Sequence, residues 1–301
     1  MYMKVPNRLQ KGDIVAITAA SGYCDGAKLE NGVRILESLG LKVKIMPSCH
    51  TRHDYLAGTD TERLADLHEA FGSKEIRAIF LARGGYGAAR LLPYLDYHFI
   101  CKNPKIFIGF SDVTALHIAI NQFCRIITYH GPMPATSFNN TDTMTLESLY
   151  TNLFESKPII APPTKTLVPG RVTGMLTGGN LSIIAASLGT PYEIKTRGRI
   201  LFLEETNEPP YRVDRLFLQL KQAGKFQDAS GIVIGDFSPE TSETLKTSIE
   251  ELIIPEGKPT IYGLPCGHTT PNITLALGSL AKITAEDTME STHQLEIHVH
   301  S

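Results

Sequence analysis

The chain has 301 residues, of which 42% are hydrophobic and 20% are charged, and its formal net charge is −2 at pH 7. This composition is typical of a globular protein, and it excludes a disordered chain and a basic surface for nucleic acid or anionic membrane. The N-terminal residues lack the pattern of a signal peptide, and no window approaches the roughly 20 apolar residues that cross a bilayer. Five scattered cysteines without a CxxC pair are typical of reduced thiols. We therefore expect a cytoplasmic protein with no nucleic-acid or membrane partner.

The first half of the chain alternates strand-like and helix-like segments. Apolar runs that end in small or glycine-rich turns predict strands at residues 13–22, 42–48, 76–87, 105–110 and 125–132. Segments of helical period lie between them, the clearest at residues 27–40, 59–73 and 112–123. This alternation predicts an α/β fold, with a flavodoxin-like parallel sheet covered by helices on both faces. Functional residues gather at the carboxyl ends of the strands in such a sheet.

A proline-rich segment, ESKPIIAPPTKTLVPG, divides the sequence into two predicted domains. We expect an N-terminal parallel α/β domain at residues 1–157, a linker at residues 158–167 and a C-terminal domain at residues 168–301. The C-terminal domain is predicted to be mixed α/β and richer in β-strands than the first, because residues 275–300 alternate like antiparallel strands.

Ser111 stands where the fourth predicted strand meets a helix, in the segment GFSDV. A sharp turn at such a join can expose a serine hydroxyl as a nucleophile and direct the amides of the helix start at an oxyanion. Serine is also a common N-cap residue, which accepts a hydrogen bond from the first turn of its helix. Val113 occupies the place of the second glycine in the hydrolase pattern G-x-S-x-G. The residues alone leave both interpretations open.

Two further segments carry candidate polar groups. The turn ARGGYGAAR has exposed backbone amides that suit a phosphate or an oxyanion, although a simple tight turn explains the glycines equally well. An apolar strand ends in Glu204 and Glu205, where an unpaired buried carboxylate is costly, so Glu204 needs a partner. Residues 211–215 can provide that partner as a structural ion pair.

His268 lies in the glycine- and proline-rich loop GLPCGHTTPN, and a histidine held by such a loop can act as a base near neutral pH. Cys266, two residues earlier, is a conceivable nucleophile or metal ligand. The segment CHTRH groups Cys49, His50 and His53, but no second cluster has metal-ligand spacing. We therefore predict no metal site.

Several motifs occur in one order across nearly the whole chain: KGDIVAITAASG, ARGGYGAARLL, GFSDVTALH, HGPM, LTGGNLS, LFLEETNEPPYRVDR and GHTTPNITLALG. With this combination the sequence resembles the serine LD-carboxypeptidases, also called muramoyltetrapeptide carboxypeptidases, whose relatives include the microcin C self-immunity hydrolases. The resemblance implies an enzyme that hydrolyses the L,D peptide bond and releases terminal D-alanine from murein tetrapeptide through an acyl-enzyme. It also implies that the enzyme works in the cytoplasm, in cell-wall recycling.

The resemblance implies a Ser–Glu–His triad. Ser111 matches the nucleophile, His268 matches the base, and Glu204 matches the carboxylate that orients the base. Glu205 lies where the family often has an aspartate or another polar residue. Because Ser111 belongs to the first predicted domain and the other two residues to the second, the catalytic cleft is expected between the domains.

The resemblance further implies an oxyanion hole made by the backbone amides of Asp112 and Gly85. Arg83, Tyr86 and Arg212 are the candidates for binding the peptide substrate. No metal or organic cofactor is expected, and the family is typically homodimeric.

Two alternative functions stay open at this stage. The first is the immunity branch of the same family, which cleaves an amide in a peptidyl-adenylate antibiotic; the absence of tryptophan leaves only Tyr and Phe as a platform for adenine. The second is a non-catalytic sugar- or nucleotide-binding module, which requires Ser111, Glu204 and His268 to be unrelated in space.

Overall fold

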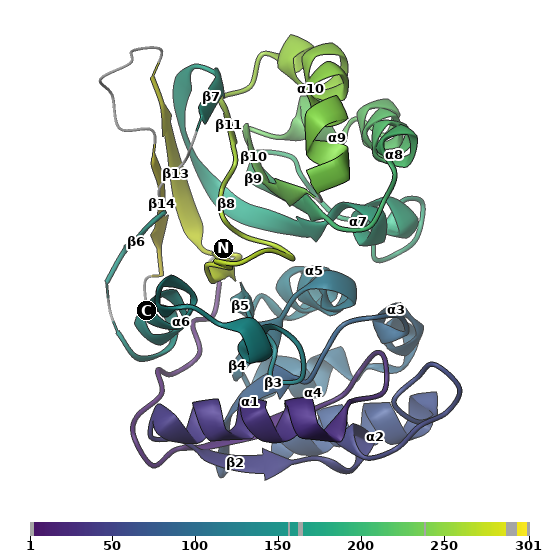
Figure 1. The fold of residues 1–301 in the computed structure, drawn as a ribbon, viewed down its shortest axis with the longest axis vertical. Helices are drawn as coiled ribbons and strands as arrows, with labels where there is room; N and C mark the ends of the chain where they lie inside the picture. The colour runs from purple at the N-terminus through teal and green to yellow at the C-terminus, as the bar shows by residue number, and fades with distance from the viewer. Residues whose placement is uncertain (1–2, 156, 162–164, 238, 287–293, 300–301) are drawn as a thin grey trace.

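A computed structural model describes residues 3–155, 157–161, 165–237, 239–286 and 294–299 (Figure 1). The chain forms two units, each built around one β-sheet. Within the described ranges, no helix combines the length and the apolar character that a membrane span requires.

The first unit holds a sheet with the strand order β12-β5-β4-β3-β1-β2. Strands β1 to β5 are parallel to their neighbours, so the order 2-1-3-4-5 is that of flavodoxin-like folds and confirms the predicted fold class. The strands are β1 (Ile14–Thr18), β2 (Lys42–Ile45), β3 (Ile76–Leu81), β4 (Ile106–Gly109), β5 (Thr128–His130) and β12 (Leu275–Leu277). The helices are α1 (Gly26–Ser38), α2 (Asp60–Gly72), α3 (Ala88–Leu91), α4 (Tyr97–Lys102), α5 (Thr114–Ala119) and α6 (Thr143–Phe154).

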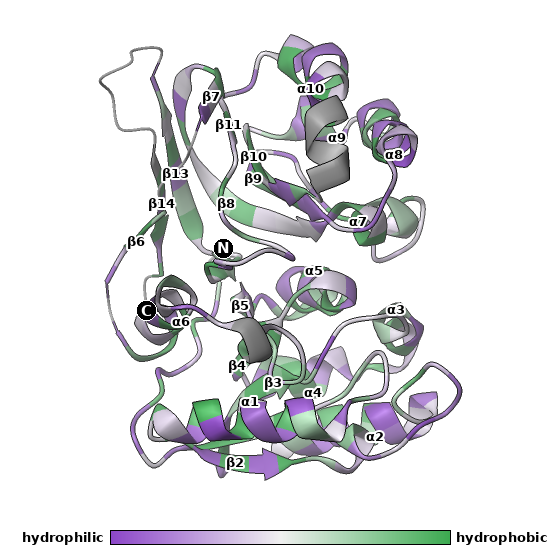
Figure 2. Cartoon of the chain, viewed as in Figure 1, coloured by the Kyte–Doolittle hydropathy of each residue, from purple (hydrophilic) through white to green (hydrophobic). Residues whose placement is uncertain are grey.

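The helices that cover this sheet carry the amphipathic pattern seen in the sequence. Hydrophilic and hydrophobic residues alternate along α1 and α2 (Figure 2), and the buried residues of α1 are Leu29, Gly32 and Leu36. Helix α2 begins with a capping box, in which Thr59 and the side chain of Glu62 satisfy each other's backbone amides. The predicted helix at 112–123 is divided into a 3-10 turn η3 (Ser111–Val113), α5 and a π-helical turn η4 (Ile120–Cys124).

The second unit holds a mixed sheet with the order β6-β14-β13-β8-β9-β10-β11-β7. Strands β8 to β11 are parallel, and the outer pairs are antiparallel, as the alternation near the C-terminus predicts. The strands are β6 (Ile159–Ala161), β7 (Lys165–Val168), β8 (Gly170–Asn180), β9 (Arg199–Glu205), β10 (Gly231–Phe237), β11 (Thr260–Tyr262), β13 (Leu280–Ala285) and β14 (Gln294–His298). The helices are α7 (Leu181–Ser187), α8 (Pro210–Gln222), α9 (Lys225–Asp228) and α10 (Pro239–Leu252).

Two segments differ from the predicted organisation. The expected linker, 158–167, supplies β6 and most of β7 to the second sheet, and residues 162–164 between them lie outside the described part. Strand β6 pairs with β14 at the edge of the sheet, where nearby prolines are tolerated. Strand β12 follows the loop 263–272 but pairs with β5 of the first sheet. The chain therefore returns from the second unit to the first at β12, and the predicted linker is part of the second sheet.

The units are joined by a close backbone contact beside α5, which lies against β8 and α7 (Figure 1). A Cβ at Gly179 would lie 2.5 Å from Thr114 Oγ1, so only glycine fits at this approach. The Thr114 hydroxyl accepts a hydrogen bond of 3.0 Å from the Asn180 amide. This contact fixes the end of β8 against the helix that follows Ser111.

Candidate active site

Ser111 occupies a strained turn at the carboxyl end of β4. Its φ is 65°, a left-handed conformation that non-glycine residues seldom adopt and that a strand-to-helix elbow requires. Neither η3 nor α5 begins with a side-chain cap, so Ser111 does not act as an N-cap. The turn therefore presents the Ser111 hydroxyl rather than using it to complete the helix.

The glycine turn after β3 packs directly on Ser111. A Cβ at Gly84 would lie 2.9 Å from Ser111 Cβ, 3.0 Å from its Oγ and 3.5 Å from the Asp112 amide nitrogen. Gly85 follows with a φ of 120°, in the region that favours glycine. The amide of Gly22 donates to the Gly84 carbonyl at 3.2 Å and joins this turn to the one after β1.

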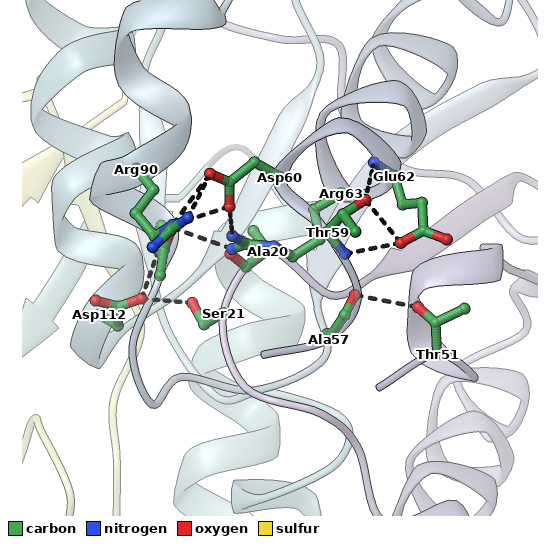
Figure 3. Close-up of polar contacts among 12 residues, drawn as sticks. Ala20, Ser21, Thr51, Ala57, Thr59, Asp60, Glu62, Arg63, Arg90 and Asp112 are labelled. Carbon is green, nitrogen blue, oxygen red and sulfur yellow. Dashed lines mark hydrogen bonds and ion pairs between the residues drawn. The ribbon is translucent and has the colours of Figure 1, made fainter. Parts of the chain in front are cut away.

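The side chain of Asp112 holds the same two turns. It is buried, and its Oδ2 accepts hydrogen bonds from Ser21 Oγ at 2.7 Å (Figure 3) and from the Ala88 amide at 2.8 Å. Burial raises the pKa of the Asp112 carboxyl above its ordinary value, although these hydrogen bonds and the charge of Arg63 oppose the rise. Asp112 thus anchors the backbone around Ser111 through its side chain.

His268 and Glu204 form a hydrogen-bonded pair in the second unit. His268 Nδ1 lies 2.7 Å from Glu204 Oε2, and the Glu204 side chain is fully buried at the end of β9. Burial lowers the pKa of the His268 imidazole, but the charge of Glu204, its hydrogen bond and the charge of Glu205 outweigh burial, so the pKa is raised overall. Glu204 therefore fixes the imidazole orientation and stabilises its protonated form.

Phe110 links this pair to the serine turn. Its ring contacts the His268 ring with centroids 4.8 Å apart, and Phe110 immediately precedes Ser111. The loop that carries His268 is held by a hydrogen bond of 3.1 Å from the Gly267 amide to Asn272 Oδ1, and by the Thr269 hydroxyl, which donates to Asp236. The structure therefore brings the candidate base from the second unit to the end of β4.

Glu205, the neighbour of Glu204, has a different environment. Its carboxylate accepts hydrogen bonds from the Ser182 amide at 2.8 Å, the Ser182 hydroxyl at 2.6 Å, Asn180 Nδ2 at 2.9 Å and the Thr206 amide at 2.9 Å. Three of these donors, from Asn180 and Ser182, belong to the start of α7, so Glu205 stabilises a helix N-terminus. The Glu204 partner is His268, and not the structural ion pair with residues 211–215 that the sequence left open.

The predicted substrate-binding residues fall into two places. Arg83 and Tyr86 line a groove of 470 Å³ together with Gly22, Tyr23, Tyr55 and Gly85. Tyr86 also borders an apolar pocket of 430 Å³ between α3, α5 and α7. Arg212 lies instead near the start of α8, where it forms an ion pair of 3.4 Å with Glu208. Arg212 lines neither of these two cavities.

The other reactive side chains raised by the sequence have no such setting. Cys266 is fully buried, and burial raises the pKa of its thiol well above the ordinary value, which suppresses the nucleophilic thiolate. Within the part of the chain that the structure describes, no three His, Cys, Asp or Glu side chains group as metal ligands.

Comparison with known proteins identifies the family. The model of the LD-carboxypeptidase N-terminal domain matches residues 15–131, and that of the LD-carboxypeptidase C-terminal domain matches residues 173–283. The chain belongs to the LD-carboxypeptidase family. A Bacillus subtilis member, named "Probable murein peptide carboxypeptidase", is 42% identical over 98% of this chain and 95% of its own length. The chain is thus a serine-type hydrolase of the LD-carboxypeptidase kind.

Solved structures of several proteins share the whole fold of this chain. A microcin-immunity-like (MccF-like) protein from Bacillus anthracis superposes with a TM-score of 0.90 at 29% identity, covering 99% of this chain and 100% of that chain. A muramoyltetrapeptide carboxypeptidase from Oxalobacter formigenes superposes with a TM-score of 0.84 at 29% identity, covering 95% and 99%. The microcin C7 self-immunity protein MccF superposes with a TM-score of 0.87 at 26% identity, covering 98% of both chains.

Sequence reasoning missed one buried charged residue near the site. Arg63 of α2 is completely buried and contacts the turns after β1 and β3 (Figure 3). A signal for it exists in the sequence, because Arg63 falls at helical spacing with Leu67, Ala70 and Phe71 and therefore on the apolar face of α2.

Proposed function

We propose that this protein is an LD-carboxypeptidase that releases the terminal D-alanine from murein tetrapeptide through an acyl-enzyme. The observation that carries the proposal is the Glu204–His268 pair, brought by Phe110 to a serine held at a φ of 65°. The name of the Bacillus subtilis relative, a murein peptide carboxypeptidase, supports the choice of substrate class.

In the first step, Ser111 attacks the scissile carbonyl. Because His268 Nδ1 is bonded to Glu204, Nε2 is the ring nitrogen left to take the proton from Ser111 Oγ. The new Oγ–C bond gives a tetrahedral intermediate, and Glu204 stabilises the imidazolium that forms. The position of Glu204 at the end of a buried strand keeps the imidazole from rotating.

The negative charge of the intermediate is proposed to reside between the backbone amides of Asp112 and Gly85. Gly84, which precedes Gly85, packs against Ser111 and against the Asp112 amide, and this contact supports the assignment. Loss of one such donor typically costs about 100- to 1000-fold in rate. His268 then protonates the leaving amine of D-alanine.

The second half of the reaction hydrolyses the acyl-enzyme. Water attacks the ester carbonyl as His268 Nε2 removes its proton, the same amides hold the second oxyanion, and the proton returns to Ser111 as the peptide acid leaves. No residue outside the Ser111, Glu204 and His268 set has to donate or accept a proton in this sequence. We propose accordingly that no cofactor takes part.

The groove beside Gly85 is proposed to bind the peptide. Arg83 Nε and Nη1 donate to the carbonyls of Gly84 and Tyr23, at 3.2 and 3.1 Å, which leaves Nη2 without a hydrogen-bond partner among the described residues. A guanidinium nitrogen held this way suits a substrate carboxylate. Tyr55 and Tyr86, which contact each other edge-to-face at 5.8 Å, form an exposed wall for the peptide chain.

We also propose a compartment and an oligomeric state for the enzyme. A murein fragment taken up for recycling is a cytoplasmic substrate, so we propose a cytoplasmic enzyme, and we propose the homodimer expected from the family resemblance. Light scattering of the purified protein across a dilution series tests the dimer, and a constant monomer mass rejects it.

The deciding experiment measures D-alanine release from L-alanyl-γ-D-glutamyl-meso-diaminopimelyl-D-alanine by wild type and by Ser111→Ala. Release by the wild type alone supports the proposal. Release by both proteins removes Ser111 as the nucleophile, and release by neither, with both folded, removes murein tetrapeptide as the substrate. A parallel assay with the L-lysine tetrapeptide distinguishes recognition of the diamino acid from recognition of the D-alanine end.

A second candidate is amide hydrolysis in a peptidyl adenylate. It is favoured by the close superposition on the microcin C7 self-immunity protein, solved structures of which include complexes with aspartyl sulfamoyl adenosine and adenosine monophosphate. The exposed rings of Tyr55 and Tyr86 are able to stack on a base. Hydrolysis of aspartyl sulfamoyl adenosine without D-alanine release supports this candidate over the first.

A further inference from the structure

Arg63 is a charged side chain in a position that normally holds an apolar one. It is completely buried, and its Nη1 donates to the carbonyl of Ala20, in the turn after β1, and to the carbonyl of Gly87 at 3.0 Å, in the turn after β3 (Figure 3). Its Nη2 forms an ion pair with Asp60. One guanidinium group therefore ties together two turns that are distant in the sequence.

Asp112 holds the same two turns with the opposite charge. It accepts from Ser21, the residue after Ala20, and from the amide of Ala88, the residue after Gly87. The cation thus takes a carbonyl from each turn, and the anion takes a donor from each turn. Arg63 and Asp112 therefore each bind both turns, and together they fix the turns relative to one another.

The turn after β3 is shaped around the guanidinium. Gly87 has a φ of 127°, and a Cβ at this position would lie 2.8 Å from Arg63 Nη1 and 2.6 Å from Leu56 Cδ2. A buried arginine is costly to desolvate, and an apolar residue of similar volume is often no less stabilising. Stability alone therefore does not explain an arginine at this buried position.

We infer that Arg63 is a positioning residue for the proposed hydrolysis: it fixes the Gly84–Gly87 turn, and with it the Gly85 amide and the Ser111–Asp112 turn, in the geometry that binds the oxyanion. This inference rests on the proposed function. Arg63 acts through the two turns, and the turns in turn contact Ser111, since Gly84 packs directly on it. Arg63 does not itself line the groove proposed for the peptide, so we expect its main effect on the transition state rather than on the binding of the peptide.

The first test compares Arg63→Met with Arg90→Met. Arg90 binds the same Asp60 at 2.9 Å but is half-exposed, and the hydrogen bonds of its guanidinium go to that carboxylate rather than to the two turns, so its side chain is the matched control. We expect kcat to fall about 100-fold in Arg63→Met, the size of a lost oxyanion donor, with KM changed less than about 3-fold. We expect Arg90→Met to change kcat less than about 3-fold, as for an exposed ion pair.

Folding is measured on the same samples by thermal unfolding, and rates are corrected for the folded fraction. Arg63→Lys serves where Arg63→Met does not fold, because an ammonium keeps the charge but lacks the planar guanidinium, in which Nη1 reaches both carbonyls while Nη2 binds Asp60. We expect about a 10-fold loss of kcat for Arg63→Lys, with KM unchanged. A kcat within about 3-fold of the wild type in a folded Arg63 variant overturns the inference.

A second readout separates this inference from the choice of substrate. A fluorophosphonate forms an Oγ–P bond at the serine and releases fluoride as His268 takes the serine proton, and its phosphoryl oxygen occupies the oxyanion hole. We expect the labelling rate of Ser111 to fall in Arg63→Met by the same factor as kcat, and to hold in Arg90→Met. If the wild type labels but releases no D-alanine, the substrate is wrong and the labelling rates still decide the role of Arg63. If the folded wild type does neither, the proposed nucleophile and the role of Arg63 both fail.

Discussion

The end of strand β9 presents two neighbouring carboxylates to two different regions of the molecule. Glu204 faces the loop 263–272 and accepts one hydrogen bond, from His268, and its Oε1 has no partner among the described residues. Glu205 faces the start of α7 and accepts four hydrogen bonds. A buried carboxylate with all its bonds made is part of the framework, whereas one with an open oxygen beside a histidine is available for chemistry.

The largest effect is expected from removing the hydroxyl of Ser111, the proposed nucleophile that the Glu204–His268 pair serves. We expect Ser111→Ala to lower kcat for D-alanine release by about a millionfold, because no acyl-enzyme can form without the serine hydroxyl. The protein should remain folded, since alanine replaces serine in the same turn.

The double variant Ser111→Ala, His268→Ala tests whether the two residues act as one unit. It should cost little more than Ser111→Ala alone. Losses that multiply instead would mean that His268 works independently of Ser111, and measured kcat values for the three variants decide between the two.

The paired variants Glu204→Gln and Glu205→Gln test the comparison directly. We expect Glu204→Gln to lower kcat about 10,000-fold, because the amide cannot stabilise the imidazolium, while the free energy of unfolding, measured at a pH above the raised pKa of His268, changes little. We expect Glu205→Gln to lower the free energy of unfolding by about 1–3 kcal/mol, because its amide group opposes the donors of α7, and to change kcat less than about 10-fold.

Steady-state kinetics and urea unfolding on both proteins check this pair of expectations. The comparison breaks if the two variants lose kcat equally, or if Glu204→Gln is the less stable of the two. Either result would show that the catalytic role has been assigned to the wrong carboxylate.

The parallel strands of the first sheet were predictable from local sequence pattern, but the pairing of β6 and β12 was not. Apolar runs with helical segments between them identify β1, β3 and β4, because buried parallel strands are continuously apolar. The edge strand β2, KVKI, instead alternates between exposed and half-buried residues. Strands β6 and β12 could not be placed in the same way. They are short, and their pairing with β14 and β5 depends on edges that exist only in the assembled fold.

The candidate site was predictable to a similar extent. The resemblance named Ser111, Glu204 and His268, but residue patterns alone left Ser111 as either a nucleophile or a cap. Its φ of 65° depends on the packing of Gly84 against it, which no local sequence rule encodes. Arg63 was missed because a charged residue on an apolar helix face is ordinarily interpreted as solvent-exposed.

The next largest expected effect is a shift in the pH dependence of kcat/KM. The pKa of His268 is raised, because the charge and hydrogen bond of Glu204 outweigh burial, and the neutral imidazole is the proposed base. We therefore expect kcat/KM to rise with pH through this raised pKa. In Glu204→Gln burial remains and the charge is lost, so the acid limb of kcat/KM should move to lower pH. An unmoved limb contradicts the pairing.

The same pair makes a stability prediction whose sign is fixed by the direction of the shift. A histidine whose pKa is raised on folding contributes stability that is fully present below the pKa of the unfolded chain and is lost as pH rises through the folded value. The difference in unfolding free energy between wild type and Glu204→Gln should therefore shrink as pH rises across that window. Urea titrations at several pH values measure it, and a difference that grows with pH rejects the assignment.

The smallest expected effect lies on the Glu205 side. Ser182→Ala removes the hydroxyl that donates to Glu205 at 2.6 Å but leaves the amide that donates at 2.8 Å, so the carboxylate keeps most of its bonds. We expect the free energy of unfolding to fall by about 1 kcal/mol and kcat to stay within about 2-fold of the wild type. Ser187→Ala is the matched control, because the Ser187 hydroxyl donates to the Ile184 carbonyl within α7 and to no carboxylate. If Ser182→Ala lowers kcat as strongly as Glu204→Gln does, the start of α7 belongs to the catalytic machinery, and the division between the two carboxylates is lost.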